Sequence, residues 1–484
     1  MHSDRPQSAE IFNNFKRCLS EQTLRSRLLN FSTSVSVSVL FFAISIGCSH
    51  GSMGPPVEEN PSTAPFVVET SVLGKELRFN PSAENRPGAE KEPYVVLISI
   101  DGYRYDYNSL YHPANLSEMA NQGMTADALI PIYPSKTFPS HYSIVTGLYA
   151  DHHGIVSNEF YDPTRQQLYA LGDRGKVEDG TWYFGEPLWL TASRQGLLSA
   201  SCFWVGSEAD IQKSHPNYYY RYDKSMSSDE RAEKIVNWLK LPAKVRPHFM
   251  TLYFDVVDLA GHHNGVDQKN LPEAIHAVDD AIGRLREGIR NLHLPVNVVV
   301  VSDHGMEDLD SSKLIDIDAV FGVVPLLSKF RLVGRGPQMM LYLKPGEDRA
   351  LISEMLRRLR LVKNHFRAFA RSEMQELHYS ASERVGDIVI VPDIPYLVGF
   401  KADPPGTRGG NHGWDAGQDL PDSKNMRGVL FAEGPAFKPH SHLKAVESVD
   451  VFPMITQILN LKNPKIDGRP EVTRQILKIR KRQK

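Results

Sequence analysis

Three aspartates stand where strand ends could bring them together. Asp101, Asp258 and Asp303 end the stretches "LISID", "LYFDVVD" and "VVVVSD", each of which begins as an apolar run. The carboxyl ends of parallel strands meet at one crevice, and carboxylates gathered there repel one another unless a cation neutralises them. The sequence therefore predicts a metal site at this edge of a sheet.

Histidines accompany these carboxylates. His262 follows Asp258 by four residues, on the same side of a helical turn, and His304 directly follows Asp303. His412 lies in "GGNHGW", where glycines let the backbone approach closely. A single Asp or His in such a place is more often a helix cap or a surface group. The joint set of carboxylate and imidazole groups favours two divalent ions, with zinc the best match.

A threonine in "SKTFPSHYSIVTG" has two interpretations. Thr137 lies at the start of a predicted helix, where its hydroxyl could cap a free backbone N–H group. Beside a metal ion, the same hydroxyl becomes a nucleophile. The two roles are compatible, because the N–H groups of a helix N-terminus also suit a phosphoryl oxygen.

The elements that carry these residues follow a repeating pattern. "YVVLISI", "HFMTLYF" and "VNVVVVS" are unbroken apolar runs, and amphipathic stretches such as "PEAIHAVDDAIGRLREGI" separate them. Such runs are typical of parallel strands that helices cover on both faces. We predict an α/β catalytic domain over residues 93–484, with a central, mostly parallel sheet sandwiched by helices. The less regular residues 312–409 are predicted to form a smaller inserted subdomain.

The first 92 residues have a different character. Basic residues precede "VSVLFFAISIGC", an apolar run too short to span a bilayer comfortably, so residues 1–48 are predicted to be a signal or anchor segment. Lipidation of Cys48, simple secretion and an uncleaved anchor stay open, and membrane attachment is one of these outcomes. Residues 49–92 are rich in Pro, Ser and Glu and are predicted to be a disordered tether.

Composition narrows the classes of partner. The 484 residues are 41% hydrophobic and 23% charged, which is typical of a globular protein. A formal net charge of −2 does not indicate the excess of positive charge that nucleic acid binding requires, and no protein partner is evident.

Three cysteines leave no disulfide framework, so we expect a bacterial cell envelope protein, periplasmic or lipid-anchored.

Several stretches resemble the nucleotide pyrophosphatase/phosphodiesterase family of the alkaline phosphatase superfamily. In chain order they are "ISIDGYRYDY", "PSKTFPSHYSIVTGLYADHHGIVSNEFYDP", "RPHFMTLYFDVVDLAGHHNG", "VVVVSDHGM" and "GGNHGWD". "SVDVFPMITQILNL" resembles the closing helix of the family. The cysteine-rich accessory domains of animal relatives have no counterpart here, so a bacterial enzyme made of the catalytic module alone is expected.

The resemblance implies an alkaline-phosphatase-like fold, two zinc ions per chain and Thr137 as the nucleophile. It also implies that Asn158 and the backbone near Thr137 bind a phosphate oxygen. Phe138 would form one wall of a base-stacking slot opposite Tyr219, and Trp204 would line the pocket, although ordinary aromatic packing is an alternative for Tyr219 and Trp204. The implied ligands are Asp101, Thr137, Asp303 and His304 for one ion, and Asp258, His262 and His412 for the other.

The expected function is a two-zinc phosphodiesterase/pyrophosphatase. It would hydrolyse nucleotides and nucleotide diesters to nucleoside 5′-monophosphates through a covalent nucleotidyl-threonine. The alternative is a lysophospholipid or choline-phosphodiester phosphodiesterase with the same catalytic set, against which the Phe138 wall argues. A phosphomonoesterase would need an arginine for the extra phosphate charge, and Arg104 is expected at the surface. A binding protein without activity stays a further possibility, against which the complete ligand set argues.

Overall fold

The computed structural model describes residues 67–70, 76–80, 82–266, 270–321, 326–362, 365–401, 409–417 and 421–478. The predicted signal or anchor segment, residues 1–48 with Cys48, lies outside these ranges, so export and lipidation stay predictions. Within the described ranges, none of the helices combines the length and the apolar character that crossing a bilayer requires.

The main sheet has ten strands in the spatial order β1-β2-β9-β8-β10-β3-β11-β20-β4-β21. Its centre is parallel, from β9 to β11, and antiparallel pairs flank this centre on both sides. The predicted α/β fold with a mostly parallel central sheet is therefore confirmed. The central strands are β9 (Tyr218–Tyr220), β8 (Ser199–Cys202), β10 (Phe249–Phe254), β3 (Tyr94–Ile100) and β11 (Val296–Val301). The outer strands are β1 (Val67–Thr70), β2 (Glu76–Phe79), β20 (Leu430–Glu433), β4 (Met124–Ala126) and β21 (Ser441–Leu443).

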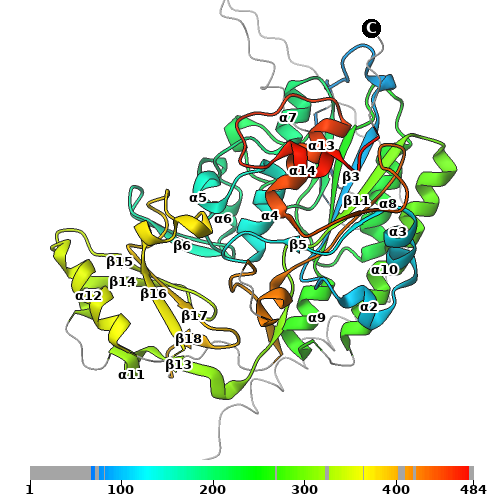
Figure 1. Cartoon of the computed structure of the whole chain (residues 1–484). Helices are drawn as coiled ribbons and strands as arrows, with labels where there is room; N and C mark the ends of the chain where they lie inside the picture. The colour runs from blue at the N-terminus through cyan, green and yellow to red at the C-terminus, as the bar shows by residue number, and fades with distance from the viewer. Residues whose placement is uncertain are drawn as a thin grey trace, which may run out of the picture. The chain divides into compact units, whose positions relative to one another are not determined.

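Both faces of the central strands are buried. Along β3, Val95 and Leu97 belong to one apolar cluster and Val96 and Ile98 to another, because successive side chains point to opposite faces. Helices cover each face, which explains the unbroken apolar runs (Figure 1). They are α3 (Ala114–Gln122), α8 (Ser228–Leu239) and α10 (Asn270–Leu292) on one face, and α4 (Thr137–Thr146), α7 (Leu188–Arg194) and α13 (Val451–Ile458) on the other.

The segment predicted to be a disordered tether, residues 49–92, is ordered at residues 76–80 and 82–92. β2 pairs with β9 at the edge of the main sheet, and Leu77 and Phe79 pack against the core. Ala89, in a short 3-10 helix (Ala89–Lys91), is buried. The prediction of disorder is wrong for this part because the average Pro, Ser and Glu content hid the alternating apolar positions of "ELRF".

A smaller sheet lies within the predicted inserted subdomain, residues 312–409. Its order is β14-β15-β17-β16, all neighbours are antiparallel, and the helix α12 (Ala350–Leu361) packs on it (yellow in Figure 1). Leu341, Met355 and Ile390 belong to an apolar cluster separate from those of the main sheet. The strands are β14 (Phe330–Val333), β15 (Met339–Leu343), β16 (Phe366–Ala370) and β17 (Ile388–Pro392). The chain returns from this subdomain through the stretch that carries His412.

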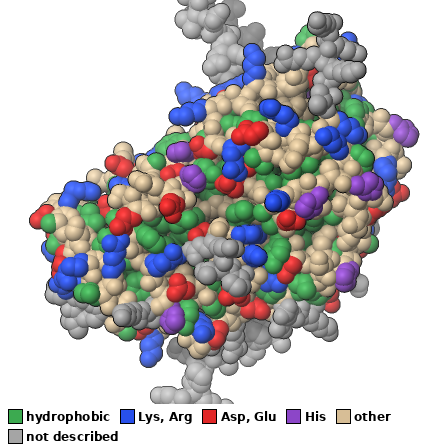
Figure 2. Space-filling view, viewed as in Figure 1, with side chains coloured by type: hydrophobic (Ala, Val, Ile, Leu, Met, Phe, Trp, Pro, Cys, Tyr) green, Lys and Arg blue, Asp and Glu red, His purple; other side chains and the backbone are tan. Residues whose placement is uncertain are grey.

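Positive and negative side chains are interspersed on the face of the molecule shown in Figure 2. This mixture agrees with the small formal net charge of the sequence. A surface of this kind attracts neither a polyanion nor a polycation over a long range. Recognition of a charged ligand on this face would therefore depend on local groups.

Candidate active site

The three aspartates lie close together beyond the carboxyl ends of the predicted strands. Asp101 directly follows β3, Asp303 follows β11, and Asp258 lies in the first turn of α9 (Val256–Asn264), just after β10. Gly102 makes the close approach possible: its φ is +68°, and a Cβ there would lie 2.9 Å from the Asp258 Cα. One carboxylate oxygen of Asp101, one of Asp258 and a ring nitrogen of His304 lie within 4.8 Å of one another.

Asp303, His304 and Asp101 form what we call the first cluster. The His304 Nε2 atom lies 3.0 Å from Asp303 Oδ2 and 3.3 Å from Asp101 Oδ1. The Thr137 Oγ1 atom lies 3.3 Å from the same Nε2. The nucleophile candidate is therefore in contact with this cluster.

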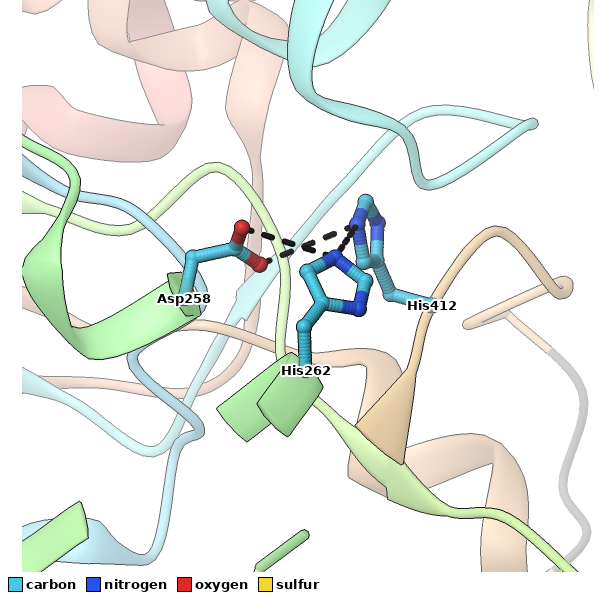
Figure 3. Close-up of side chains that lie close together, drawn as sticks. All are labelled: Asp258, His262 and His412. Carbon is cyan, nitrogen blue, oxygen red and sulfur yellow. Dashed lines mark hydrogen bonds and ion pairs between the residues drawn. The ribbon is translucent and has the colours of Figure 1, made fainter. Parts of the chain in front are cut away.

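Asp258, His262 and His412 form the second cluster, and their side chains point toward one another (Figure 3). His262 Nε2 lies 3.5 Å from Asp258 Oδ2, and His412 Nε2 lies 3.8 Å from Asp258 Oδ1. The two Nε2 atoms are 3.2 Å apart. Asp258 and His262 share one side of α9, as their spacing of four residues predicts.

Hydrogen bonds to the backbone fix the orientation of the three histidine rings. In each ring Nδ1 faces a carbonyl oxygen, which can only accept, so Nδ1 carries the proton and Nε2 presents a lone pair. The Nε2 lone pairs point toward one another and toward carboxylate oxygens. Ligand atoms that converge in this way suit a metal ion. The pairs are His262 with Gly410 at 2.9 Å, His304 with Gly305 at 2.9 Å, and His412 with Ser135 at 2.8 Å.

Two buried carboxylate oxygens, Asp101 Oδ1 and Asp258 Oδ1, have no hydrogen-bond donor among the described residues. A buried anionic oxygen without a donor is costly, and a cation removes this cost. Mixed carboxylate and imidazole ligands fit a borderline divalent ion such as zinc. The residues present therefore fit divalent metal binding.

Electrostatic effects shift the pKa values of the two carboxylates of the first cluster in opposite directions. Burial raises the pKa of Asp101 well above its usual value, and the charges of Asp303 and Asp258 raise it further. Burial also acts to raise the pKa of Asp303, but His141 and His304 outweigh it and hold that pKa well below its usual range. Without a cation, Asp303 is the carboxylate that stays ionised.

Thr137 is the first residue of α4, and Lys136 occupies the N-cap position. The Lys136 side chain makes no capping bond, and the Phe138 N–H group in the first turn of α4 donates to Asn158 Oδ1 rather than to Thr137. The capping interpretation of Thr137 is therefore wrong. Its hydroxyl instead lies beside His304.

A cavity of about 440 Å³ opens onto both clusters and Thr137. Of the predicted substrate-binding residues, Phe138, Asn158 and Trp204 line it. Asn158 Oδ1 accepts a hydrogen bond from the Phe138 N–H group at 2.9 Å, which leaves the amide nitrogen of Asn158 as its donor. Trp204 is mostly buried, and its Nε1 donates to the His141 carbonyl at 3.1 Å.

Tyr219 does not line this cavity, so the prediction that it faces Phe138 is wrong. Tyr219 lies inside β9, is 3% exposed and stacks on His215 with ring centroids 4.9 Å apart. Tyr222, which follows the end of β9, lines the cavity instead and is 41% exposed. The rule that ligands bind beyond the carboxyl ends of strands would have selected Tyr222.

Two residues beside the first cluster were missed in the sequence. Tyr253, in β10, donates its hydroxyl proton to Asp101 Oδ2 at 2.5 Å. His141 lies one helical turn after Thr137 in α4, and its Nδ1 lies 3.1 Å from Asp303 Oδ2. The spacing of four residues between Thr137 and His141 was the available signal, since it places both on one helical face.

Comparison with known proteins agrees with these features. A sequence model of the family "Type I phosphodiesterase / nucleotide pyrophosphatase" matches residues 95–415. The chain is 30% identical over 406 residues to ectonucleotide pyrophosphatase/phosphodiesterase family member 3 of Rattus norvegicus, which covers 82% of this chain and 45% of that protein. It is 32% identical over 402 residues to a venom phosphodiesterase of Naja atra, with 81% and 47% covered. The chain thus spans about half the length of these curated relatives.

Solved structures are similar as well. Murine ectonucleotide pyrophosphatase/phosphodiesterase 5 superimposes with a TM-score of 0.73 at 27% identity, over 80% of this chain and 100% of that chain. An inactive variant of the same murine protein, in complex with AMP, gives a TM-score of 0.73 at 26% identity, over 80% of this chain and 100% of that chain. The alkaline-phosphatase-like fold expected from the sequence is confirmed by this likeness.

Proposed function

The chain belongs to the type I phosphodiesterase/nucleotide pyrophosphatase family, and from this premise we propose that it is a two-zinc phosphodiesterase/pyrophosphatase. It hydrolyses nucleotides and nucleotide diesters to nucleoside 5′-monophosphates. The observation that carries the proposal is the contact of Thr137 Oγ1 with His304 Nε2, 3.3 Å away, at the opening of both clusters into one cavity.

Each ion is assigned to one cluster. The first cluster with Thr137 would hold one zinc ion, and the second cluster would hold the other. When bound, zinc lowers the pKa of a hydroxyl group at the metal and neutralises negative charge on a phosphoryl group. The carboxylate oxygens without donors and the histidine lone pairs support this assignment.

Thr137 is the nucleophile of the proposed reaction. Its oxygen forms a bond to the phosphorus that bears the nucleoside, the bond from phosphorus to the leaving group breaks, and the threonine proton passes to solvent. Water then hydrolyses the nucleotidyl-threonine, which releases the nucleoside 5′-monophosphate and restores the hydroxyl. The amide nitrogen of Asn158 and the N–H group of Thr137 are the donors proposed for a non-bridging phosphate oxygen.

A nucleobase is the ligand that we propose for the aromatic side chains of the cavity. Phe138 and Tyr222 line it, and both present aromatic surface. Aromatic rings bind the faces of planar bases by stacking. The murine relative that was solved with AMP supports a nucleotide as the ligand of this chain.

The choline alternative is less well supported. Glu208 and Asp255 line the cavity beside aromatic rings, a combination that attracts a quaternary ammonium group. Both carboxylates already have cationic partners, because Arg174 pairs with Glu208 and Arg231 pairs with Asp255 at 2.8 Å. A choline headgroup would have to compete with these arginines.

A phosphomonoesterase is also disfavoured. Arg104 was expected at the surface, but it is 9% exposed and binds Asp106 at 2.7 and 3.0 Å. The expectation is wrong because the Asp106 carboxylate satisfies the guanidinium inside the protein. An arginine held in this way does not supply the extra positive charge that a dianionic monoester needs.

The proposed function is tested by parallel product analysis with ATP, a dinucleotide, a choline lysolipid and a phosphate monoester. ATP is expected to give AMP and pyrophosphate, and the dinucleotide a nucleoside 5′-monophosphate. The Thr137→Ala variant is the control for contaminating activity. ADP as the first product from ATP, or faster turnover of the lysolipid or the monoester, would contradict the proposal.

A further inference from the structure

His141 occupies a central position that the proposed reaction has not yet used. It is fully buried in α4, one turn after Thr137. Its Nδ1 atom lies 2.9 Å from the Thr137 carbonyl oxygen and 3.1 Å from Asp303 Oδ2. Both oxygens are acceptors, so Nδ1 carries a proton that faces the backbone of the nucleophile and a carboxylate of the first cluster.

The other end of the ring is fixed as well. His141 Nε2 lies 2.8 Å from the hydroxyl of Ser99, a buried residue in β3 two positions before Asp101. The rings of Trp204 and Tyr253 meet the imidazole edge-on, with centroids 5.2 and 5.1 Å away. Polar and aromatic contacts thus hold the ring in one orientation.

We propose that His141 is a positioning residue that ties the first cluster to the nucleophile. Its Nδ1–H group holds the turn that carries Thr137 at a fixed place relative to Asp303. Metal affinity of the first cluster and orientation of the Thr137 hydroxyl are therefore coupled through one imidazole. This inference rests on the proposed role of Thr137, but its metal-binding part can be measured without any substrate.

The molecule offers a matched control in α5 (Ala150–His153), the helix that follows α4. His153 is also fully buried, and its Nε2 lies 2.9 Å from the hydroxyl of Ser143, a residue of α4. Its Nδ1 accepts a hydrogen bond from the Ile155 N–H group at 3.2 Å. His153 is therefore a serine-paired histidine packed against α4 that does not line the cavity.

The test compares His141→Asn, His141→Gln and His141→Ala with His153→Gln. The asparagine amide nitrogen replaces Nδ1 and can still donate to the Thr137 carbonyl, whereas the glutamine amide nitrogen replaces Nε2 and faces Ser99 instead. Zinc affinity is measured on metal-free protein by competition with a chromogenic chelator. Turnover of a nitrophenyl nucleotide diester is measured separately, as kcat and KM.

His141→Asn is expected to keep the zinc affinity of the first cluster within about threefold, whereas the glutamine and alanine variants lose about 10- to 100-fold. In the His141 variants the loss of turnover should lower kcat rather than raise KM. His153→Gln should change neither the zinc affinity nor the turnover. Equal zinc affinity of the asparagine and glutamine variants would overturn the inference, because both remove the ring and differ in the donor position. A wild-type protein that binds zinc but does not hydrolyse the diester would instead refute the proposed function.

Discussion

The two clusters differ in how far they are shielded from solvent. In the first cluster the side chains of Asp303 and His304 are 0% exposed and that of Asp101 is 2% exposed. In the second cluster His262 is 35% exposed and Asp258 is 13% exposed, whereas His412 is 6% exposed. On this difference we propose a division of labour, in which the shielded cluster keeps Thr137 in place and the more open cluster meets the leaving group and the incoming water.

The surroundings of the clusters support this division. The Gly102 N–H group donates to Asp303 Oδ1 at 3.2 Å, and Tyr253 donates to Asp101, so the first cluster is fixed by groups from the turn after β3 and from β10. The second cluster depends on the glycine-rich return from the inserted subdomain. There a Cβ at Gly409 would lie 2.0 Å from the His262 carbonyl oxygen, so a larger residue at that position cannot be accommodated without movement.

Removal of the nucleophile should have the largest effect. Thr137→Ala is expected to lower kcat by about a thousandfold or more, whereas Thr137→Ser keeps an alcohol and part of the turnover. Since Thr137 makes no capping bond, the alanine variant should not lose the ~1 kcal/mol of stability that loss of a cap costs. Kinetics and thermal melts of both variants check this. Substantial turnover of Thr137→Ala would contradict the shielded cluster's role.

Substitution of the proposed metal ligands should have the second largest effect, and this effect should differ between the two clusters. His412→Ala should lower kcat by about 100-fold and leave one zinc ion per chain, because the first cluster keeps all its ligands. Asp303→Asn should lose the ion of the first cluster and impair Thr137 directly. Elemental analysis with kinetics of both variants measures the contrast. Loss of both ions from His412→Ala would show that the clusters do not bind metal independently.

Much of the fold could be predicted from the sequence because buried parallel strands are continuous apolar runs whose carboxyl ends meet at one edge of the sheet. β3 has the bounds of its apolar run, β10 and β11 differ from theirs by one residue, and the aspartates beyond the three strands meet as the rule for parallel sheets requires. Two site contacts were missed although the sequence carried a signal for each. The spacing of four residues places His141 on the same face of α4 as Thr137, but its distance of 3.1 Å to Asp303 Oδ2 depends on how α4 packs in the fold. Tyr222 rather than Tyr219 lines the cavity because β9 stops at Tyr220, and the residue at which a strand ends is not set by the apolar pattern.

Metal binding to the first cluster should depend on pH. The pKa of Asp101 is raised mainly by burial, and the pKa of His304 is raised because Asp303 outweighs the opposing effect of burial. Protons on these groups compete with the metal, so the affinity should rise with pH, by up to about tenfold per pH unit for each proton released. Calorimetry of zinc binding in two buffers with different ionisation enthalpies measures this release. A pH-independent affinity would contradict the shielded character of the cluster.

The smallest effect concerns the substrate side of the cavity. Tyr222→Ala should raise KM for a nucleotide substrate by about tenfold, which corresponds to loss of roughly 1.4 kcal/mol of stacking, and should leave kcat nearly unchanged. Tyr219→Phe is the control, because Tyr219 lies in β9 away from the cavity. Steady-state kinetics with ATP check the pair. A rise in KM for Tyr219→Phe and none for Tyr222→Ala would reverse the assignment of the aromatic wall.

The central claim is that Thr137 attacks phosphorus before water does. Hydrolysis of a nucleotide with a chiral thiophosphate at the reacting phosphorus, in heavy-oxygen water, tests it most directly. Two successive in-line displacements invert phosphorus twice, so the account predicts overall retention of configuration and the heavy oxygen in the nucleoside monophosphate alone. Inversion at phosphorus, or the label in the pyrophosphate, would contradict it.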